Sequence, residues 1–282
     1  MEITESVFHM QQRSEEIRRS GRRIAFVPTM GFFHEGHLEL MREAGRRADI
    51  LVVSIFVNPI QFGPAEDYET YPRDMEGDRT KAENMGVDIL YAPSAKEMYP
   101  DGFQTRVSVG RITKYLCGIS RPGHFDGVTT VVAKLFNAVR PHVVVFGRKD
   151  FQQFVVVRRM VEDLNMDIEV IDVPTVREPG GLAMSSRNKY LNPDEKMSAL
   201  CIKKSMDRAA AMVKEGENDS GKILSEIRKL ILDHPYTRID YIHICDPGTM
   251  EDKDTVQGDT LLALAVYVGG TRLIDNCLLT NS

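Results

Sequence analysis

The hydrophobic positions of the first 175 residues gather into five short runs, at 23–27, 50–57, 88–91, 142–147 and 168–173. The run at 50–57 is continuous and rich in β-branched residues, which is typical of a strand buried on both faces of a parallel sheet. Segments with a helical spacing of apolar residues lie before and between the runs, at 1–20, 36–47, 74–85, 127–139 and 150–165. This alternation predicts an α/β fold built on a Rossmann-like, doubly wound parallel sheet.

The alternation stops at the turn-forming sequence Glu-Pro-Gly-Gly at 178–181. Two helical segments follow, at 194–215 and 219–233, and then three strand-like runs, at 238–245, 260–268 and 272–276. Long helices followed by adjacent strands predict a smaller α+β domain with an antiparallel sheet. We therefore expect two domains, residues 1–180 and residues 181–282.

Ligands of doubly wound sheets bind at the carboxyl ends of the strands, and three informative segments fall there: 28–37, 58–62 and 148–153. The first reads Pro-Thr-Met-Gly-Phe-Phe-His-Glu-Gly-His, in the order strand, glycine turn and helix. Such a turn favours an anion, because backbone N–H groups and the positive end of the helix dipole meet there. His34 and His37 lie three residues apart and therefore share one face of the helix.

The histidine pair has two other interpretations. A zinc site of the metalloprotease type needs its second histidine one residue later, where Leu38 stands. Two surface histidines without a function are the default for an isolated pair, but this pair coincides with a turn and a helix start. Phosphate oxygens are therefore the ligand that we expect.

The second segment and a later loop offer further polar groups. Asn58 and Gln61 carry amides that suit hydroxyls or a carboxylate, although a simple polar turn is the favoured interpretation of this stretch taken alone. The Gly/Pro loop at 121–127 either brings Arg121 and His124 to an anion or is a stiff turn.

Two more segments carry chemistry that suits a nucleotide. Lys149 is a compact cation for phosphate, and Asp150 can accept from ribose hydroxyls or cap a helix. The sequence Met-Ser-Ser-Arg-Asn at 184–188 combines hydroxyls with a guanidinium, which fits a polyphosphate.

Composition narrows the class of protein. The net charge of 36 − 41 = −5 gives no general attraction to nucleic acid or to anionic membranes. The four cysteines form no CxxC pair, which is typical of reduced thiols in a cytoplasmic protein. No apolar run approaches the roughly 20 residues of a membrane span, and the acidic N-terminus does not read as a signal peptide. We expect a cytoplasmic protein with no nucleic-acid or membrane partner.

Together these segments resemble a known family. A His-x-x-His turn after the first strand and a Ser-Ser-Arg loop after the fifth are typical of nucleotidyltransferases of the class I aminoacyl-tRNA synthetase type, with Ala-Met-Ser-Ser-Arg at 183–187 in place of Lys-Met-Ser-Lys-Ser. More narrowly, the whole chain is similar to the bacterial pantothenate synthetases, or pantoate–β-alanine ligases. The matching motifs are PTMGxxHEGH at 28–37, FVNPxQF at 56–62, YPRD at 71–74, RPGHFxGV at 121–128, GxKDxQQ at 147–153, LAMSSRN at 182–188 and RLIDN at 272–276. The chain departs from the family at Gly77, which interrupts an acidic helix that is usually richer in charge.

The resemblance implies an ATP-dependent ligase that condenses (R)-pantoate with β-alanine through a pantoyl adenylate and releases diphosphate and AMP. It implies catalytic roles for His34, His37 and Lys149, and it places pantoate or β-alanine at Gln61 and Gln153. ATP is expected against Met30, Gly31, Phe32, Phe33, His34, Glu35, Gly36, His37, Gly147, Arg148, Lys149, Asp150, Val176, Met184, Ser185, Ser186 and Arg187. Mg²⁺ is expected to arrive with ATP, held by phosphate oxygens and water rather than by protein side chains. A homodimer is also implied.

Three rival functions compete with this one. An adenylyl- or cytidylyltransferase of the same fold is the main alternative, although the two glutamines and GxKDxQQ argue against it. A tRNA-binding synthetase needs a larger domain than the roughly 95 residues after the hinge. A nucleotide-sensing module without catalysis has no feature that favours it.

Overall fold

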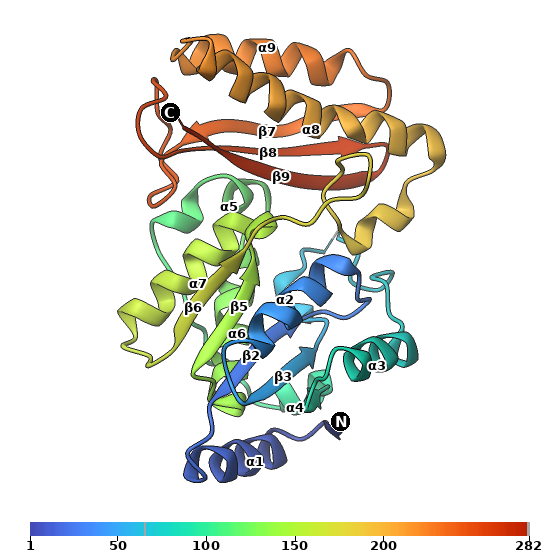
Figure 1. Cartoon of the computed structure of the whole chain (residues 1–282), viewed down its shortest axis with the longest axis vertical. Coiled ribbons are helices and arrows are strands. Elements are labelled where there is room, and N and C mark those ends of the chain that lie inside the picture. Colours follow the sequence, from blue (N-terminus) through green and yellow to red (C-terminus); the bar gives the residue numbers. More distant parts are fainter. Residues whose placement is uncertain (65, 281–282) are drawn as a thin grey trace. The chain divides into compact units, whose positions relative to one another are not determined.

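The computed structural model describes residues 1–64 and 66–280 (Figure 1). The chain forms two compact units. The first unit comprises Met1–Gly110, Arg121–Arg148 and Gln153–Pro174, and the second comprises Arg111–Ser120, Lys149–Gln152 and Thr175–Ser282. The domain boundary expected at 180/181 remains a prediction about which segments fold independently.

A six-stranded sheet in the order β1-β4-β3-β2-β5-β6 forms the centre of the first unit, and every adjacent pair is parallel. From β2 the chain adds β3 and β4 on one side, then returns to add β5 and β6 on the other. The doubly wound prediction is therefore confirmed, and the order of strands reverses between β2 and β5. The strands are β1 (Glu2–Thr4), β2 (Ile24–Thr29), β3 (Ile50–Ile55), β4 (Ile89–Tyr91), β5 (Val143–Gly147) and β6 (Glu169–Val173).

Helices cover both faces of this sheet. The ring of Phe26 in β2 meets Phe136 of α6 edge-on, with 6.4 Å between ring centroids. Ala25 and Val27, which point to the opposite face of the same strand, pack with residues of α2 and α3. The helices around the parallel sheet are α1 (Val7–Arg19), α2 (Glu35–Gly45), α3 (Met75–Asn84), α4 (Ala95–Met98), α6 (His124–Val139) and α7 (Phe151–Asp163). The 3-10 turns of this region are η1 (Pro59–Gln61) and η3 (Arg148–Asp150).

The N-terminal prediction needs a correction, because residues 1–20 are not one helix. Glu2, Ile3 and Thr4 pair in parallel with β4 as the edge strand β1. The helix α1 begins only at Val7, after the N-cap Ser6, whose hydroxyl accepts from His9 N at 3.4 Å. A strand of three residues is too short to show an alternating pattern, and its partner lies more than 80 residues away.

β2 also runs two residues beyond its predicted end, through Pro28. The carbonyl of Ile24 accepts from His142 N on the β5 side, whereas the carbonyl of Thr29 accepts from Phe56 N on the β3 side. Alternate residues of a parallel strand bond to opposite neighbours, so Pro28 faces β5. Its missing N–H therefore leaves the ladder with β3 intact, and the strand continues.

The same proline limits the pairing at the point where the strand order reverses. Among the described residues, β2 and β5 pair only at Ala25↔Val143 and Phe26↔Val144. Both strands continue for three more residues toward their carboxyl ends. Because proline has no N–H for the ladder, the local sequence itself ends the pairing beside the expected ligand position.

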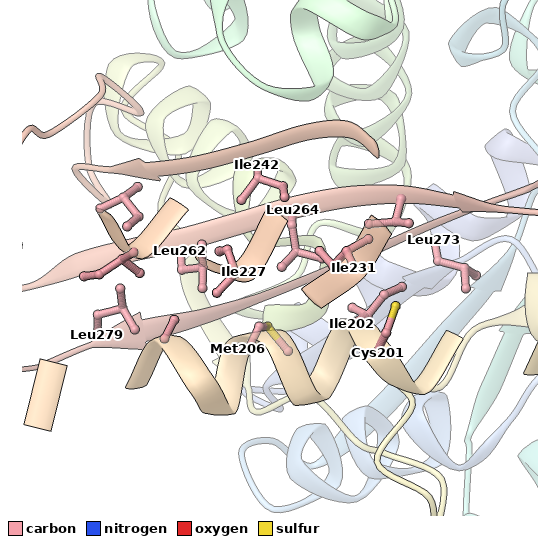
Figure 2. Close-up of a cluster of buried hydrophobic side chains, with 14 of the residues drawn as sticks. Cys201, Ile202, Met206, Ile227, Ile231, Ile242, Leu262, Leu264, Leu273 and Leu279 are labelled. Atoms are coloured by element: carbon pink, nitrogen blue, oxygen red, sulfur yellow. The ribbon is translucent and has the colours of Figure 1, made fainter. Parts of the chain in front are cut away.

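The second unit contains an antiparallel sheet in the order β7-β8-β9, as the sequence predicts. One face of this sheet packs against α8 and α9 through a core of aliphatic side chains, including Ile202, Met206, Ile227 and Leu264 (Figure 2). The elements are η2 (Ile112–Lys114), α5 (Cys117–Ser120), η4 (Ser186–Tyr190), α8 (Pro193–Lys214), α9 (Ser220–Leu232), β7 (Thr237–Cys245), β8 (Thr260–Val268) and β9 (Thr271–Leu279). None of the helices in the described residues combines the length and apolarity needed to cross a membrane.

Candidate functional site

The turn after β2 has a shape that requires glycine. Gly31 has a φ of +82°, in the left-handed region. A Cβ atom at this position would lie 2.9 Å from Asp78 Oδ2 and 2.9 Å from Ile55 Cγ2, both closer than a real contact. The turn therefore admits no larger residue, because both the backbone angle and the space exclude a side chain.

Asp78 of α3 holds this turn from behind. Its two oxygens accept from the backbone N–H groups of Phe32 and Phe33, each at 2.6 Å. Lys81, one helical turn later, donates to the carbonyl of Phe33 at 2.8 Å. Burial raises the pKa of the Asp78 carboxyl, while the N–H groups of Phe33 and Phe32 and the charge of Lys81 act in the opposite direction. Sequence reasoning missed Asp78, because its partners lie 45 and 46 residues earlier in the chain.

These contacts correct the expectation that the backbone of the turn is available to an anion. The N–H groups of Phe32 and Phe33 belong to Asp78, and that of Gly31 donates to Thr29 Oγ1 at 3.1 Å. The N–H of His34 reaches His37 Nδ1 at 3.4 Å. We therefore expect an anion at this turn to meet the histidine side chains and the start of α2 rather than the N–H groups of the turn.

The two predicted histidines lie against each other. The ring centroids of His34 and His37 are 4.1 Å apart and the ring planes differ by 27°. Nδ1 of His37 accepts from a backbone N–H, so its ring proton belongs on Nε2 when the ring is neutral.

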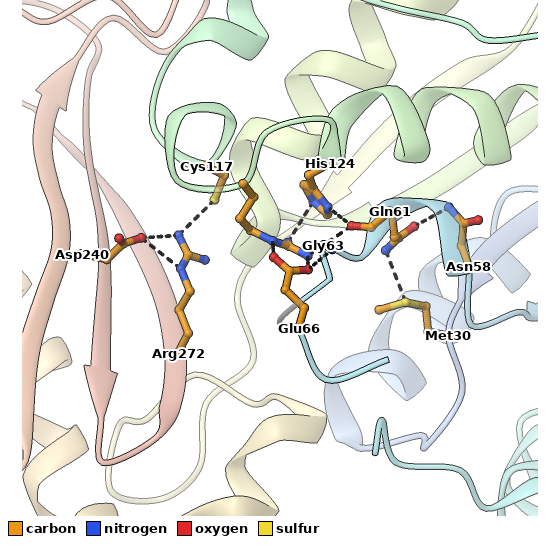
Figure 3. Close-up of polar contacts among 10 residues, drawn as sticks. Met30, Asn58, Gln61, Gly63, Glu66, Cys117, His124, Asp240 and Arg272 are labelled. Atoms are coloured by element: carbon orange, nitrogen blue, oxygen red, sulfur yellow. Dashed lines mark hydrogen bonds and ion pairs between the residues drawn. The ribbon is translucent and has the colours of Figure 1, made fainter. Parts of the chain in front are cut away.

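Gln61 lies at the end of the 3-10 turn that follows β3, and it is buried (Figure 3). Its Oε1 accepts from Asn58 Nδ2 at 2.9 Å, and its Nε2 lies 3.4 Å from Met30 Sδ. The prediction for the segment at 58–62 left two alternatives, a polar turn and a ligand site. The structure shows an ordered amide pair that borders Met30 of the turn.

The side chains of Arg121 and His124 both bond to other residues of the first unit. The guanidinium of Arg121 binds both oxygens of Glu66, each at 2.6 Å, and its Nη1 lies 3.1 Å from His124 Nε2 (Figure 3). Burial raises the pKa of Glu66, but the hydrogen bonds and charge of Arg121 outweigh that effect and hold the pKa below its usual range. Nδ1 of His124 lies 2.9 Å from the carbonyl oxygen of Gln61. The loop at 121–127 therefore acts as a rigid support for Gln61.

The carboxyl end of β5 contributes Gly147 and Arg148 to the first unit. A Cβ at Gly147 would lie 4.0 Å from Leu40 Cδ2 of α2, so this glycine sits against the helix that carries the histidines. The guanidinium of Arg148 pairs with Asp172 of β6. The geometry thus assigns the Arg148 side chain to a salt bridge within the sheet.

Two neighbouring glutamines of α7 have different surroundings. Gln152 is buried, accepts from Cys117 N at 3.0 Å and donates to the carbonyls of Ile112 and Tyr115 at 2.9 and 2.8 Å. Gln153 is half-buried, and its amide makes no hydrogen bond within residues 1–64 and 66–280. Gln152 therefore has a structural role, and the ligand role of Gln153 stays a prediction.

Lys149 is held by its backbone, with Asn276 Nδ2 of β9 donating to its carbonyl at 2.9 Å. Its ammonium lies 3.5 Å from Asp150 Oδ1, and its side chain is only 20% exposed. A contact of this length to an exposed carboxylate is weak, so the charge of Lys149 is little compensated.

The loop after β6 forms a short hairpin in the second unit. The carbonyl of Val176 accepts from Met184 N at 2.9 Å, which brings two of the predicted ATP ligands together. Arg177 next to it binds both oxygens of buried Asp275, at 2.6 and 3.0 Å. Burial lowers the pKa of Arg177, but the bonds to Asp275 raise it further than burial lowers it.

The Ser-Ser-Arg segment at the end of this hairpin is also fixed. Ser185 caps η4 by accepting from Arg187 N at 3.3 Å. Asn188 donates to Glu178 Oε1 at 2.8 Å and to the carbonyl of Ala183 at 3.0 Å. The hydroxyls and the guanidinium of the motif thus stand on a loop whose backbone is held at both ends.

Strand β9 explains why the RLIDN motif at 272–276 accompanies the site motifs. Arg272 binds Asp240 of β7 and reaches Cys117 Sγ at 3.6 Å (Figure 3). Asp275 holds Arg177, and Asn276 holds the carbonyl of Lys149. One strand therefore positions three segments of the second unit.

Comparison with known proteins agrees with this geometry. The family model for pantoate–β-alanine ligase matches residues 2–278. The pantothenate synthetases of Syntrophus aciditrophicus and Geobacter sulfurreducens are 57% and 55% identical to the chain, over 98% and 99% of its length and 96% and 99% of theirs.

Solved structures show the same relationship. Pantothenate synthetase from Thermus thermophilus superposes with a TM-score of 0.93 at 42% identity, covering 99% of both chains. Pantoate–β-alanine ligase from Francisella tularensis, complexed with β-γ ATP and β-alanine, gives a TM-score of 0.82 at 33% identity and covers 100% of both chains. The chain therefore belongs to the pantoate–β-alanine ligase family.

Proposed function

We propose that the chain joins (R)-pantoate to β-alanine in two steps. The pantoate carboxylate attacks the α-phosphorus of ATP, which forms pantoyl adenylate and releases diphosphate. The amine of β-alanine then attacks the acyl carbon, forms the amide bond of pantothenate and expels AMP. The observation that carries this proposal is the stacked pair His34–His37, which follows the carboxyl end of β2 in a chain that matches the family over almost its whole length.

The residues proposed to bind ATP occur in both units. In the first unit they are Met30–His37 with Gly147 and Arg148, and in the second they are Lys149, Asp150, Val176 and Met184–Arg187. Because Arg148 pairs with Asp172 and the N–H groups of Phe32 and Phe33 bind Asp78, these three residues line the site rather than donate to phosphate. His34, His37, Lys149 and Arg187 supply the charged and N–H donors.

These donors suit the first step. Negative charge accumulates around the α-phosphorus as the carboxylate attacks, and fixed donors stabilise that arrangement more than the separated substrates. No nucleophilic side chain is needed, because the substrate itself supplies the nucleophile. The Nε2–H of His37 is the proposed donor, since Nδ1 accepts from the backbone.

Gln61 and Gln153 are proposed to hold pantoate. Gln61 borders Met30 of the turn, and Gln153 offers an amide with no hydrogen bond inside the described chain. Alanine at either position removes an amide that pairs with a substrate oxygen, at a cost of about 1–3 kcal/mol. Calorimetry should show weakened pantoate binding and nearly unchanged ATP binding. Loss of ATP binding alone would remove both glutamines from the pantoate site.

Magnesium is proposed to enter with ATP. No group of three or more His, Cys, Asp or Glu side chains that could hold a metal ion occurs within residues 1–64 and 66–280. Asp78 is the buried acid that contacts the histidine turn, but both its oxygens accept N–H groups, so it does not fit as a cation ligand. Phosphate oxygens and water supply the ligands instead.

We also propose a homodimer and a cytoplasmic location. The first unit exposes Ile3 and Phe8, at 44% and 62%, near its edge strand β1, which is consistent with a subunit contact there. All four cysteines are free thiols, as in a reducing compartment. Sedimentation should show twice the chain mass at micromolar concentration, and a single species of 31.9 kDa would reject the dimer.

One experiment tests the proposed reaction. Exchange of labelled diphosphate into ATP should require pantoate and should not require β-alanine, because adenylation precedes amide formation. Adding β-alanine should produce AMP. Exchange without pantoate, or formation of ADP, would favour the alternative of another nucleotidyltransferase of this fold.

A further inference from the structure

Asn58 occupies a position where its amide can face only one way. The side chain is 1% exposed and has three partners in the first unit: Gly127, Gln61 and Tyr99. The contact with Gly127 is to a carbonyl oxygen, at 3.1 Å, and a carbonyl oxygen only accepts. The NH₂ group of Asn58 must therefore point to Gly127, and its Oδ1 must point away.

Tyr99 meets that Oδ1. Its hydroxyl donates to Asn58 Oδ1 at 2.7 Å. The ring lies between Phe56 and Phe103, with centroid distances of 6.1 and 5.0 Å, so packing fixes where the hydroxyl stands. Burial raises the pKa of Tyr99 well above its usual value, which keeps the hydroxyl protonated and able to donate. Every hydrogen-bonding group of the Asn58 amide thus has a defined partner.

The orientation of the Asn58 amide determines the orientation of the Gln61 amide. The second N–H of Asn58 Nδ2 donates to Gln61 Oε1, so the Gln61 amide turns its oxygen toward Asn58 and its Nε2 toward Met30 (Figure 3). The backbone of Gln61 has no freedom to compensate. His124 Nδ1 reaches its carbonyl, and a Cβ at Gly127 would lie 2.6 Å from its Cα, so α6 presses directly on the turn.

We propose that Tyr99, acting through Asn58, is a positioning residue that makes Gln61 present N–H groups, and not its carbonyl, to the substrate. This proposal rests on the proposed role of Gln61 in pantoate binding. Met30 Sδ, 3.4 Å from Nε2, is a weak acceptor. An acceptor oxygen of pantoate, such as a carboxylate oxygen, offers a stronger partner for that N–H. The relay therefore selects for an acceptor in the substrate at this point.

The first test compares two tyrosines of the same unit. Tyr99→Phe removes only the hydroxyl that satisfies Asn58, and it should raise the KM for pantoate about tenfold while changing the KM for ATP by no more than about twofold. Tyr91→Phe is the matched control, because Tyr91 is fully buried and its hydroxyl contacts only Met98 Sδ, at 3.7 Å, within the part of the chain that the structure describes. The pantoate KM of Tyr91→Phe should stay at the wild-type value, even if its melting temperature falls as much as that of Tyr99→Phe.

The second test reads the polarity of Gln61 itself. Gln61→Glu keeps an acceptor and removes the donors, whereas Gln61→Met removes both at similar length. Both should raise the pantoate KM by about tenfold or more, with glutamate at least as impaired as methionine. Near-normal pantoate binding by Gln61→Glu would show that the site needs an acceptor and would overturn the proposal.

The two tests separate the proposal from the role on which it rests. If Gln61→Met leaves pantoate binding unchanged, the proposed pantoate site is wrong. If Gln61→Met weakens pantoate binding while Tyr99→Phe behaves like Tyr91→Phe, the site stands and the positioning role of Tyr99 is wrong.

Discussion

The turn at 29–34 and the loop at 182–188 both carry residues that are proposed to bind ATP, and a buried carboxylate supports each of them differently. Asp78, 1% exposed, binds the first directly through two backbone N–H groups. Asp275, 3% exposed, supports the loop at 182–188 indirectly. It binds the guanidinium of Arg177, which lies on the other side of the hairpin. The first carboxylate determines the shape of a turn, and the second neutralises a half-buried cation.

This difference predicts different consequences for the same substitution. Asparagine in place of Asp78 keeps the size of the side chain and loses the ability to accept twice. Asparagine in place of Asp275 leaves a guanidinium without its counter-charge. We therefore expect the second unit to lose mainly stability and the first to lose mainly activity.

The largest effect should come from Asp275→Asn. Breaking a fully buried ion pair costs about 3–5 kcal/mol, and because Arg177 is half-buried and keeps some contact with water, we expect a loss toward the lower end of that range. Chemical denaturation should show this loss in the free energy of unfolding. Asp207→Asn is the control, since Asp207 pairs with Lys203 while 63% exposed, and such pairs contribute little. A cost for Asp275→Asn as small as that of the control would show that Arg177 needs no counter-charge.

Lys149→Ala tests the other segment that β9 holds. Asn276 binds the backbone carbonyl of Lys149, so the substitution keeps this anchor while it removes the ammonium with the side chain beyond Cβ. Charge-assisted contacts to a developing anion are worth roughly 2–4 kcal/mol, so turnover should fall about 10²–10³-fold with little change in melting temperature. Lys222→Ala, on a side chain that is 68% exposed, should change neither. Wild-type turnover combined with a lowered melting temperature would make Lys149 a structural residue.

Asp78→Asn should cost less stability than Asp275→Asn and should have a selective effect on activity. Its amide can accept one of the two N–H groups and must oppose the other, at a cost of about 1–3 kcal/mol. Because the turn carries His34 and His37, adenylation should fall more than aminolysis of supplied pantoyl adenylate. Asp74→Ala is the matched control, since it removes the N-cap of the same helix and costs about 1 kcal/mol without touching the turn. If Asp78→Asn and Asp74→Ala slowed adenylation and aminolysis to the same extent, Asp78 would contribute to stability alone.

The sequence predicted the regular elements well because their signals are local. The expected run at 260–268 is β8 (Thr260–Val268), and the helix expected at 219–233 is α9 (Ser220–Leu232). The position of the histidine pair at the end of β2 also followed from local order. The strand β1 did not, because three residues carry no periodicity.

The contacts that shape the site could not be predicted in the same way. Asp78 reaches Phe32 across 46 residues, Tyr99 reaches Asn58 across 41 and Asp275 reaches Arg177 across 98. A hydrophobic pattern places each element in the fold, but it does not say which polar side chain meets which backbone group. For that reason the sequence left two interpretations of Arg121, an anion ligand and part of a turn. The structure shows that its guanidinium binds Glu66.

The most direct test of the proposed chemistry is a rapid-quench measurement of both half-reactions in His37→Ala. His37 faces the turn with Nδ1 and should donate from Nε2 to charge that develops during adenylation. Adenylate formation should fall about 10²-fold or more, on the scale of losing one transition-state donor, while aminolysis of supplied pantoyl adenylate should fall much less. His9→Ala, on the exposed surface of α1, should leave both rates unchanged. Equal losses in the two half-reactions of His37→Ala, or a loss confined to aminolysis, would contradict the assignment of the histidine turn to the adenylation step.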